Sequence, residues 1–143
     1  MRRITLFIVT IAMLMSCIGG AYKSTSDGVI VNVQNREENG PARVRLQIMS
    51  EGIVRVSQTP DRKFHDRNSL IILPDAQRET NFEVVDSEAS VGIKTSELYV
   101  TVNKTDGVVT FMDAKGNVIS KESEPTSFAP VSVTDTKGTT TGY

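Results

Sequence analysis

The chain has 143 residues, of which 38% are hydrophobic and 23% charged, with a net charge of −1 and a single cysteine. This length suits one domain with a core of its own, and the near-neutral, interspersed charge argues against a nucleic-acid partner. One cysteine excludes an internal disulfide and makes redox chemistry an unfavoured function.

The first 16 residues have the features of a targeting segment. Arg2 and Arg3 precede an apolar run from Ile4 to Met15, which is shorter than the roughly 20 residues that a membrane-spanning helix needs. The run ends in Leu14-Met15-Ser16-Cys17, which resembles the bacterial lipobox. This resemblance implies cleavage before Cys17 and acylation of the new N-terminal cysteine. The alternative is an ordinary secretory signal that contains a cysteine.

Lipidation at Cys17 would anchor the protein in the bacterial cell envelope, facing the periplasm or on the outer-membrane surface. Stable anchoring takes more than one acyl chain, which the lipoprotein modification supplies. Residues 17–27 are small and polar, and we expect them to form a flexible tether. We expect residues 28–143 to form the folded domain, as the N-terminal part of a longer protein. The polar end at 137–143 looks like an interrupted chain, although a frayed terminus would have the same composition.

The folded part has strand periodicity throughout. The clearest case is the segment from Ala42 to Met49, in which Val44, Leu46 and Ile48 alternate with polar side chains. Turn residues punctuate the strands, most clearly at Asp106-Gly107. The expected strands are Gly28–Val33, Ala42–Met49, Ile53–Gln58, Leu70–Leu73, Phe82–Val85, Val91–Thr95, Leu98–Asn103, Val108–Met112, Val118–Ile119 and Val131–Thr134. This spacing predicts an all-β fold, an antiparallel β-sandwich.

Several of these strands also carry a family resemblance. The matching pieces, in chain order, are Ile53-Val-Arg-Val with Thr59-Pro60, Ser69-Leu70, Val91-x-Ile-x-Thr95 with Leu98-x-Val-x-Val102, and Gly107-Val-Val-x-Phe111 with Asp113 and Gly116. Their order and spacing resemble the N-terminal, galactose mutarotase-like β-sandwich domain of glycoside hydrolase family 31, which includes α-glucosidases and α-xylosidases. The resemblance covers residues 28–133.

The resemblance implies what the chain does and what it lacks. In that family a (β/α)₈ barrel follows this domain and holds two aspartates, the nucleophile and the general acid of a retaining mechanism. A barrel takes about 200 residues or more, so this chain would be an inactive, non-catalytic domain of a lipid-anchored α-glycosidase. Its expected partners are a membrane, through the N-terminal lipid, and an α-glucoside or α-xyloside oligosaccharide, through the parent enzyme. No cofactor is implied, and no substrate-binding residue is assigned.

A different class of function fits the same residues. The chain could be a free-standing β-sandwich lipoprotein that binds a glycan or a partner protein. Phe64, Tyr99 and Phe111 are its candidate sugar-stacking residues, although Phe111 is expected in the core and Tyr99 on a sheet surface. The sequence contains no tryptophan, which weakens this reading because sugar platforms favour flat aromatic rings.

No residue pattern points to catalysis or to a metal. His65 is the only histidine, and a metal site needs further ligands. The aspartates fall where turns are expected, which is the ordinary place for aspartate; they are Asp61, Asp66, Asp75, Asp106 and Asp113. Ser69 and Ser87 lack a partner base other than His65. Asn103-Lys104-Thr105 fits the N-glycosylation sequon, which in a bacterial lipoprotein is expected to be accidental.

Overall fold

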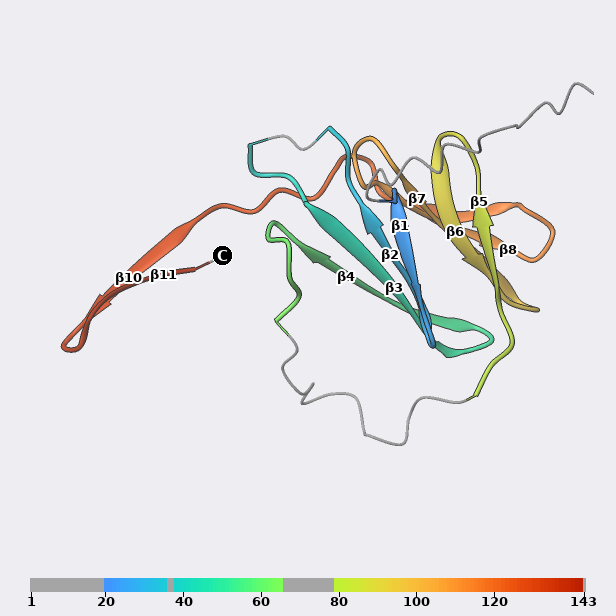
Figure 1. Ribbon diagram of the computed structural model, residues 1–143, viewed down its shortest axis with the longest axis horizontal. Coiled ribbons are helices and arrows are strands. Elements are labelled where there is room, and N and C mark those ends of the chain that lie inside the picture. The colour runs from blue at the N-terminus through green and yellow to red at the C-terminus, as the bar shows by residue number, and fades with distance from the viewer. Residues whose placement is uncertain (1–19, 36–37, 66–78, 143) are drawn as a thin grey trace, which may run out of the picture.

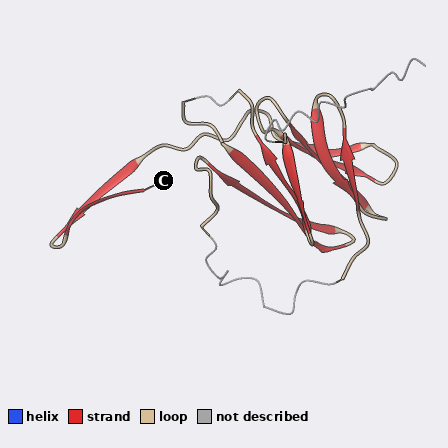
Figure 2. Cartoon of the chain, in the orientation of Figure 1, coloured by secondary structure: helices blue, strands red, loops and turns tan. Residues whose placement is uncertain are grey.

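The computed structural model describes residues 20–35, 38–65 and 79–142, and every regular element in these ranges is a strand (Figure 2). The strands are β1 (Tyr22–Thr25), β2 (Gly28–Asn32), β3 (Arg43–Ser50), β4 (Ile53–Thr59), β5 (Glu83–Asp86), β6 (Ser90–Lys94), β7 (Leu98–Asn103), β8 (Val109–Asp113), β9 (Val118–Lys121), β10 (Val131–Asp135) and β11 (Gly138–Gly142). The predicted all-β, antiparallel fold is confirmed. Within these ranges no helix has the length and apolar character needed to cross a membrane.

Two antiparallel sheets face each other (Figure 1). The first contains β1-β2-β3-β4 and the second β5-β6-β7-β8-β9, so that chain neighbours are also sheet neighbours in both. Tight turns join such strands, and each sheet therefore folds from local pairings. The chain crosses from one sheet to the other once, between β4 and β5.

The core lies between the inner faces of the two sheets. In β3 the predicted alternation is confirmed, because Val44, Leu46 and Ile48 are buried whereas their neighbours are half-buried. Across the interior, Val91 and Ile93 of β6 meet them. The rest of this cluster comes from β2, β7 and β8, as Val29, Val31, Val100, Val102 and Val109. β-branched residues dominate it, as expected where side chains pack on pleated surfaces.

The sheet begins earlier in the chain than the sequence suggested. β1 lies within residues 17–27, where we expected a tether, and it pairs with β2 from Tyr22↔Val31 to Thr25↔Gly28. Its sequence, Tyr-Lys-Ser-Thr, is polar, and only Tyr22 packs against the core. Such an edge strand is held by backbone bonds to its neighbour more than by side-chain burial, which leaves little signal in the sequence.

The last hairpin departs from the predicted sandwich. β10 falls where a strand was expected, but it pairs only with β11, in a two-stranded sheet of its own. Figure 1 shows this hairpin, in red, standing clear of both sheets. The expected domain of residues 28–143 is therefore a sandwich as far as β9 and a projecting ribbon after it. The expected strand Leu70–Leu73, the signal segment 1–16 and Cys17 lie outside the described residues.

Candidate functional site

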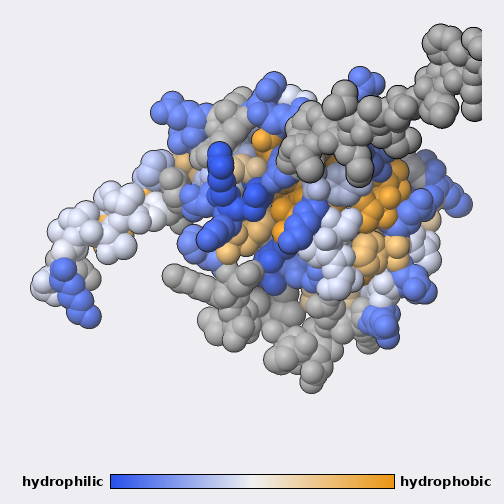
Figure 3. Space-filling model, in the orientation of Figure 1, coloured by the Kyte–Doolittle hydropathy of each residue, from blue (hydrophilic) through white to orange (hydrophobic). Residues whose placement is uncertain are grey.

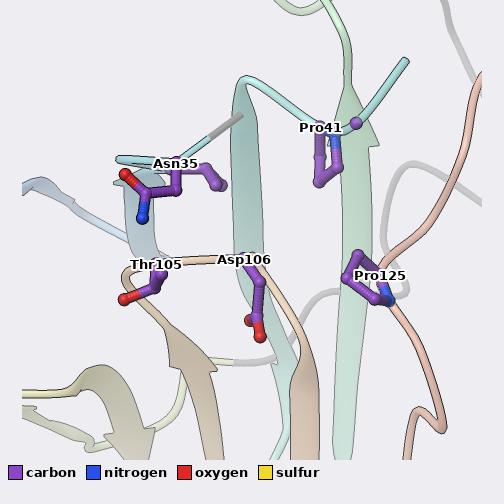
Figure 4. A pocket seen from close by; sticks show the side chains of 7 residues that line it. Asn35, Pro41, Thr105, Asp106 and Pro125 are labelled. Atoms are coloured by element: carbon purple, nitrogen blue, oxygen red, sulfur yellow. The ribbon is translucent and has the colours of Figure 1, made fainter. Parts of the chain in front are cut away.

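One end of the sandwich carries a hollow of about 220 Å³. The segment between β2 and β3 forms one wall, the turn between β7 and β8 a second, and the stretch that follows β9 a third. The lining residues are Val33, Asn35, Gly40, Pro41, Thr105, Asp106 and Pro125. Figure 4 shows the polar side chains of Asn35, Thr105 and Asp106 on one side and the proline rings of Pro41 and Pro125 on the other.

Backbone hydrogen bonds between the two sheets fix the walls. The N–H of Gln34 donates to the carbonyl of Lys104 at 2.8 Å, and the N–H of Asn35 donates to the carbonyl of Thr105 at 2.9 Å. The third wall is fastened by the N–H of Phe128, which donates to the carbonyl of Asn39 at 2.7 Å. Since these bonds join segments far apart in sequence, the hollow is a feature of the folded domain and not of one loop.

Gly107 lets the two sheets close at this end. Its φ of +80° is one that residues with a side chain rarely adopt. A Cβ at this position would lie 3.0 Å from Pro41 Cγ and from Val33 Cγ2. The Asp106-Gly107 turn predicted from the sequence therefore serves two purposes: it reverses the chain and it admits the opposite wall of the hollow.

Asp106 is the one carboxylate in the lining. Its Oδ1 accepts a hydrogen bond from the N–H of Val108 at 2.9 Å, while its Oδ2 accepts none from the described part of the chain. Thr105 and Asn35 are the other polar residues of this lining. Donors and acceptors above apolar rings suit a polyhydroxy ligand. Retaining hydrolysis needs two carboxyl groups about 5–5.5 Å apart, and the lining of this hollow contains one.

A second hollow, of about 360 Å³, adjoins the first, because Asp106 and Pro125 line both. Glu122 lies in it, but both of its carboxylate oxygens are engaged in holding the sandwich together. Oε1 accepts from Gln58 Nε2 at 3.0 Å, and Oε2 accepts from the N–H of Val109 at 2.8 Å. In this hollow Glu122 therefore has a structural role, whereas Asp106 keeps one carboxylate oxygen, Oδ2, that accepts no hydrogen bond from the described part of the chain.

A third hollow, of about 490 Å³, lies at the turn between β3 and β4. Three glutamates line it, Glu51, Glu79 and Glu97, and all three are exposed to solvent. Glu51 is held through its backbone, because the hydroxyl of Thr95 donates to its carbonyl at 2.6 Å. In a catalytic pair, enclosed surroundings shift the pKa values of the two carboxyl groups apart, so that one acts as acid and the other as base or nucleophile. Exposed carboxylates lack such surroundings. Among the described residues, no three His, Cys, Asp or Glu side chains lie close enough together to hold a metal ion, these glutamates included.

His65 and Asp61 form an exposed pair. Their side chains are 78% and 50% exposed, and His65 Nε2 lies 3.6 Å from Asp61 Oδ2. Asp61 belongs to a turn in which its N–H donates to the Thr59 hydroxyl at 3.1 Å. These contacts agree with a surface turn and bring no further ligand or nucleophile to His65.

Asp113 organises the turn between β8 and β9. Its Oδ1 accepts the N–H groups of Lys115 and Asn117 at 2.8 and 2.9 Å, and its Oδ2 accepts from Asn117 Nδ2 at 2.8 Å. These hydrogen bonds, with the Asn117 side chain first, hold the pKa of Asp113 below its ordinary value of 3.8 because they stabilise the charged form. The predicted turn role of this aspartate fits the geometry.

The remaining candidates also have local roles where they are described. Ser87 bonds with Ser90 at the turn between β5 and β6. In the sequon, Asn103 Oδ1 accepts the N–H of Thr105 at 2.8 Å, within a tight hairpin. Asp66, Ser69 and Asp75 lie outside the described residues.

The three aromatic residues do not form a sugar-binding platform. Phe64 stacks on Arg45, whose guanidinium carbon lies 4.6 Å from the ring centroid. Tyr99 is half-buried on the outer face of β7 and covers Gly92, at which an added Cβ would lie 3.0 Å from its ring. Phe111 packs against the core, as predicted.

The sequence did not single out most residues of the first hollow. Asp106 was noted only as a turn residue and Thr105 only as part of the sequon, and Asn35 and Pro125 were not noted as candidates at all. The one available signal was the pair of turn motifs, Asn39-Gly40-Pro41 and Asp106-Gly107, which are 65 residues apart and give no indication that they meet.

Comparison with known proteins relates this fold to a part of a glycoside hydrolase. No protein-family model matches the chain. Among solved structures, a GH31 α-xylosidase from Xanthomonas citri matches 83% of this chain with a TM-score of 0.65 and 29% sequence identity. The chain resembles one domain-sized part of a family 31 glycoside hydrolase. It spans 12% of the length of that enzyme.

A second structure is an uncharacterized protein from Listeria monocytogenes, crystallised with glucose, magnesium and calcium. It matches 71% of this chain and 9% of its own, with 16% identity and a TM-score of 0.48. This likeness is too slight to carry an argument. The sequence-based resemblance to family 31 is therefore supported by the α-xylosidase, at the level of a glycoside-hydrolase-related sandwich domain.

Proposed function

We propose that this chain is the N-terminal, non-catalytic sandwich domain of a lipid-anchored retaining α-glycosidase, either an α-glucosidase or an α-xylosidase. The observation that carries the proposal is the likeness to the α-xylosidase, which spans 83% of this chain at 29% identity. Fold alone says little about function, but identity of that size adds residue-level likeness to the shared fold.

The chemistry of the described residues supports a non-catalytic role. The first hollow has a single carboxylate, Asp106, and the second holds Glu122 in two structural hydrogen bonds. The three glutamates of the third hollow are exposed. The acid and nucleophile of the enzyme would then belong to its barrel, and the sandwich would support that barrel.

An activity assay tests this proposal. Purified residues 17–143 should leave aryl α-xylosides and aryl α-glucosides intact, whereas the whole product of the gene should hydrolyse one of them with retention of anomeric configuration. Hydrolysis by residues 17–143 alone would overturn the non-catalytic assignment. Inactivity of a well-folded whole product on both substrates would overturn the glycosidase.

The lipid anchor is part of the same proposal and rests on the sequence. Cys17 follows Leu14-Met15-Ser16 in the manner of a lipobox, and acylation there would place the domain at the cell envelope. Cells fed a labelled fatty acid should incorporate it into this protein but not into its Cys17→Ser variant. Equal labelling of the two would exclude Cys17 as the acylated residue.

The first hollow favours one second candidate, a glycan-binding domain. The side chains of Asn35, Thr105 and Asp106 line the hollow opposite the rings of Pro41 and Pro125, and a sugar ring uses polar and apolar contacts together (Figure 4). Loss of a single hydrogen bond to a ligand costs about 0.5–1.5 kcal/mol. Thr105→Val should therefore weaken xylose or glucose binding by roughly three- to tenfold.

Calorimetric or NMR titration of the two sugars measures this effect. Thr140→Val is the matched control, because Thr140 is exposed on β11, away from the hollow. Binding that is equal in both variants, or absent from the parent chain, would rule out this second candidate.

A further inference from the structure

The outer face of the first sheet carries only basic charges along its strands. Side chains alternate between the two faces of a strand, so the residues between the buried valines point outward. Pairing of the strands β1 to β4 places Lys23, Ile30, Arg45 and Ser57 in one row across this face. The rows on either side add Arg43 and Arg55. These are all the charged residues of the four strands, and each is a cation.

The second sheet does not share this bias. Its strands carry both signs, because Glu83 lies directly opposite Lys94 and Asp86 pairs with Lys104 at 2.6 Å. The chain as a whole has a net charge of −1, so the cations of the first sheet are segregated on one face. In Figure 3, hydrophilic residues gather in blue over the region that Figure 1 shows to be strands β1 to β4.

Contacts within this face position two of its guanidinium groups. Arg43 Nε donates to Asn32 Oδ1 at 3.0 Å, and the Arg45 guanidinium stacks on the ring of Phe64. Neither contact neutralises a charge, because an amide and an aromatic ring carry none. The three arginines are half-buried and Lys23 is exposed. Such arginines lay their apolar stems on the sheet and keep the charged head group in water.

Asn32 also ties this face to the beginning of the described chain. Its Nδ2 donates to the carbonyl of Gly20 at 2.9 Å, and its N–H donates to the carbonyl of Ala21 at 2.8 Å. The sheet therefore holds the chain from Gly20 onward, three residues after Cys17. Three residues span at most about 11 Å, which is comparable with the Debye length of about 8 Å at physiological ionic strength. A lipid on Cys17 would thus bring Arg43 and its neighbours within electrostatic reach of the bilayer.

We propose that the outer face of the first sheet lies against anionic phospholipid headgroups of the membrane that holds the lipid on Cys17, with Lys23, Arg43 and Arg55 as its main contacts. This inference rests on the proposed lipid anchor. Charge complementarity favours an anionic surface, and the short link to Cys17 favours the surface next to the anchor. Each basic residue near an anionic bilayer adds roughly fivefold to membrane affinity. The domain would then be held in one orientation and would not move freely on its tether.

Lysine labelling on vesicles tests the inference. Cys17 is the only cysteine of the chain, so residues 17–143 can be coupled through it to a maleimide lipid, whether or not cells acylate it. On phosphatidylcholine vesicles with about 30% phosphatidylglycerol, Lys23 should react with a water-soluble acylating reagent at least about fivefold more slowly than on pure phosphatidylcholine. Lys94, exposed on the second sheet, should react equally on both. Salt at about 0.5 M should remove the difference.

Charge variants show which residues make the contact. The double variant R43Q/R55Q should lose most of the protection of Lys23. Arg55→Gln alone should lose part of it, and this change breaks no hydrogen bond found among the described residues. Lys94→Gln is the matched control, because it removes a cation from the second sheet and should leave the protection of Lys23 unchanged. Urea unfolding of each variant verifies that the sandwich is folded.

Each outcome decides a different point. Equal labelling of Lys23 on the two kinds of vesicle would overturn the membrane contact and leave the lipid anchor standing. Equal protection of Lys94 and Lys23, or protection that R43Q/R55Q retains, would do the same. If Lys23 is already protected in the whole gene product without vesicles, another part of that protein covers the face and the proposal fails. If fatty-acid labelling excludes Cys17, the anchor falls and this inference falls with it.

Discussion

Gln58 on β4 and Glu122 after β9 join the two sheets across the open side of the sandwich. The side-chain amide of Gln58 donates to Glu122 Oε1 at 3.0 Å, although the two residues are 64 positions apart. The other oxygen of Glu122 accepts the N–H of Val109, a residue with 1% exposure. One carboxylate thus satisfies a buried backbone donor and connects the sheets that frame both hollows.

Removal of the Glu122 carboxylate should lower the unfolding free energy clearly, whereas a conservative replacement should lower it little. Glu122→Ala leaves the N–H of Val109 and the amide of Gln58 without partners, at a cost of about 1–3 kcal/mol in unfolding free energy. Glu122→Gln keeps one acceptor for Val109. If the Gln58 side-chain amide turns over, the new amide can donate to Gln58 Oε1, which is buried and has no hydrogen-bond partner among the described residues. Its cost should be below about 1 kcal/mol. Urea denaturation measures both, and equal costs would contradict the bridging role.

Gly107 should be harder to replace than Gly116, the glycine of the β8–β9 turn. Gly107→Ala places a methyl group against Pro41 and Val33 and holds alanine at a φ of +80°. Gly116→Ala is the matched control, because its φ is +89° but its Cβ would meet nothing within 4 Å. The control should lose about 1–2 kcal/mol from backbone strain alone. Gly107→Ala should lose clearly more, and equal losses would show that the walls of the hollow can relax.

Substitution of Leu46, which is buried in the core, should cost more unfolding free energy than substitution of Ile53, which is exposed. Leu46 is 0% exposed between the sheets, so Leu46→Ala should destabilise the domain by about 2–5 kcal/mol. Ile53 is 59% exposed, and Ile53→Ala should change the unfolding free energy by no more than about 0.5 kcal/mol. Thermal or urea unfolding of both variants checks this. A small effect at Leu46 would contradict the packing of the two sheets.

Asp113 should add an acid-sensitive contribution to stability. Its folded-state pKa lies below the ordinary 3.8 because Asn117 and the turn amides bond the carboxylate. The carboxylate therefore stabilises the fold fully above pH 4, and this contribution is lost as the pH falls through the lowered pKa. The stability difference between the parent chain and Asp113→Ala should shrink between pH 5 and pH 2. A difference that stays constant would show that the turn does not depend on the charge.

The sequence was sufficient for the parts of the fold that local patterns specify. Alternation in β3 and the Asp106-Gly107 turn were both correct, because side-chain period and turn chemistry act over a few residues. β1 was not predicted, because its residues are polar and backbone hydrogen bonds to β2 hold it in the sheet. The projecting ribbon was also missed: Val131 and Val133 have the same pattern whether a sheet covers them or not.

The first hollow could not be foreseen for a similar reason. Its walls come from residues 33, 35, 40, 41, 105, 106 and 125, and only the folded chain brings these together. The backbone bonds that join them, such as Asn35 to Thr105, involve no particular side chain. The family resemblance, by contrast, depended on the order of several strands and was supported by the α-xylosidase comparison.

The reading frame beyond the codon for Tyr143 tests the central claim most directly. We expect it to continue for several hundred codons into a (β/α)₈ barrel, with aspartates at the ends of its strands as nucleophile and general acid. A stop codon immediately after Tyr143 in an intact gene would contradict the account. The chain would then be a free-standing lipoprotein, with its hollow beside Asp106 as the site to study.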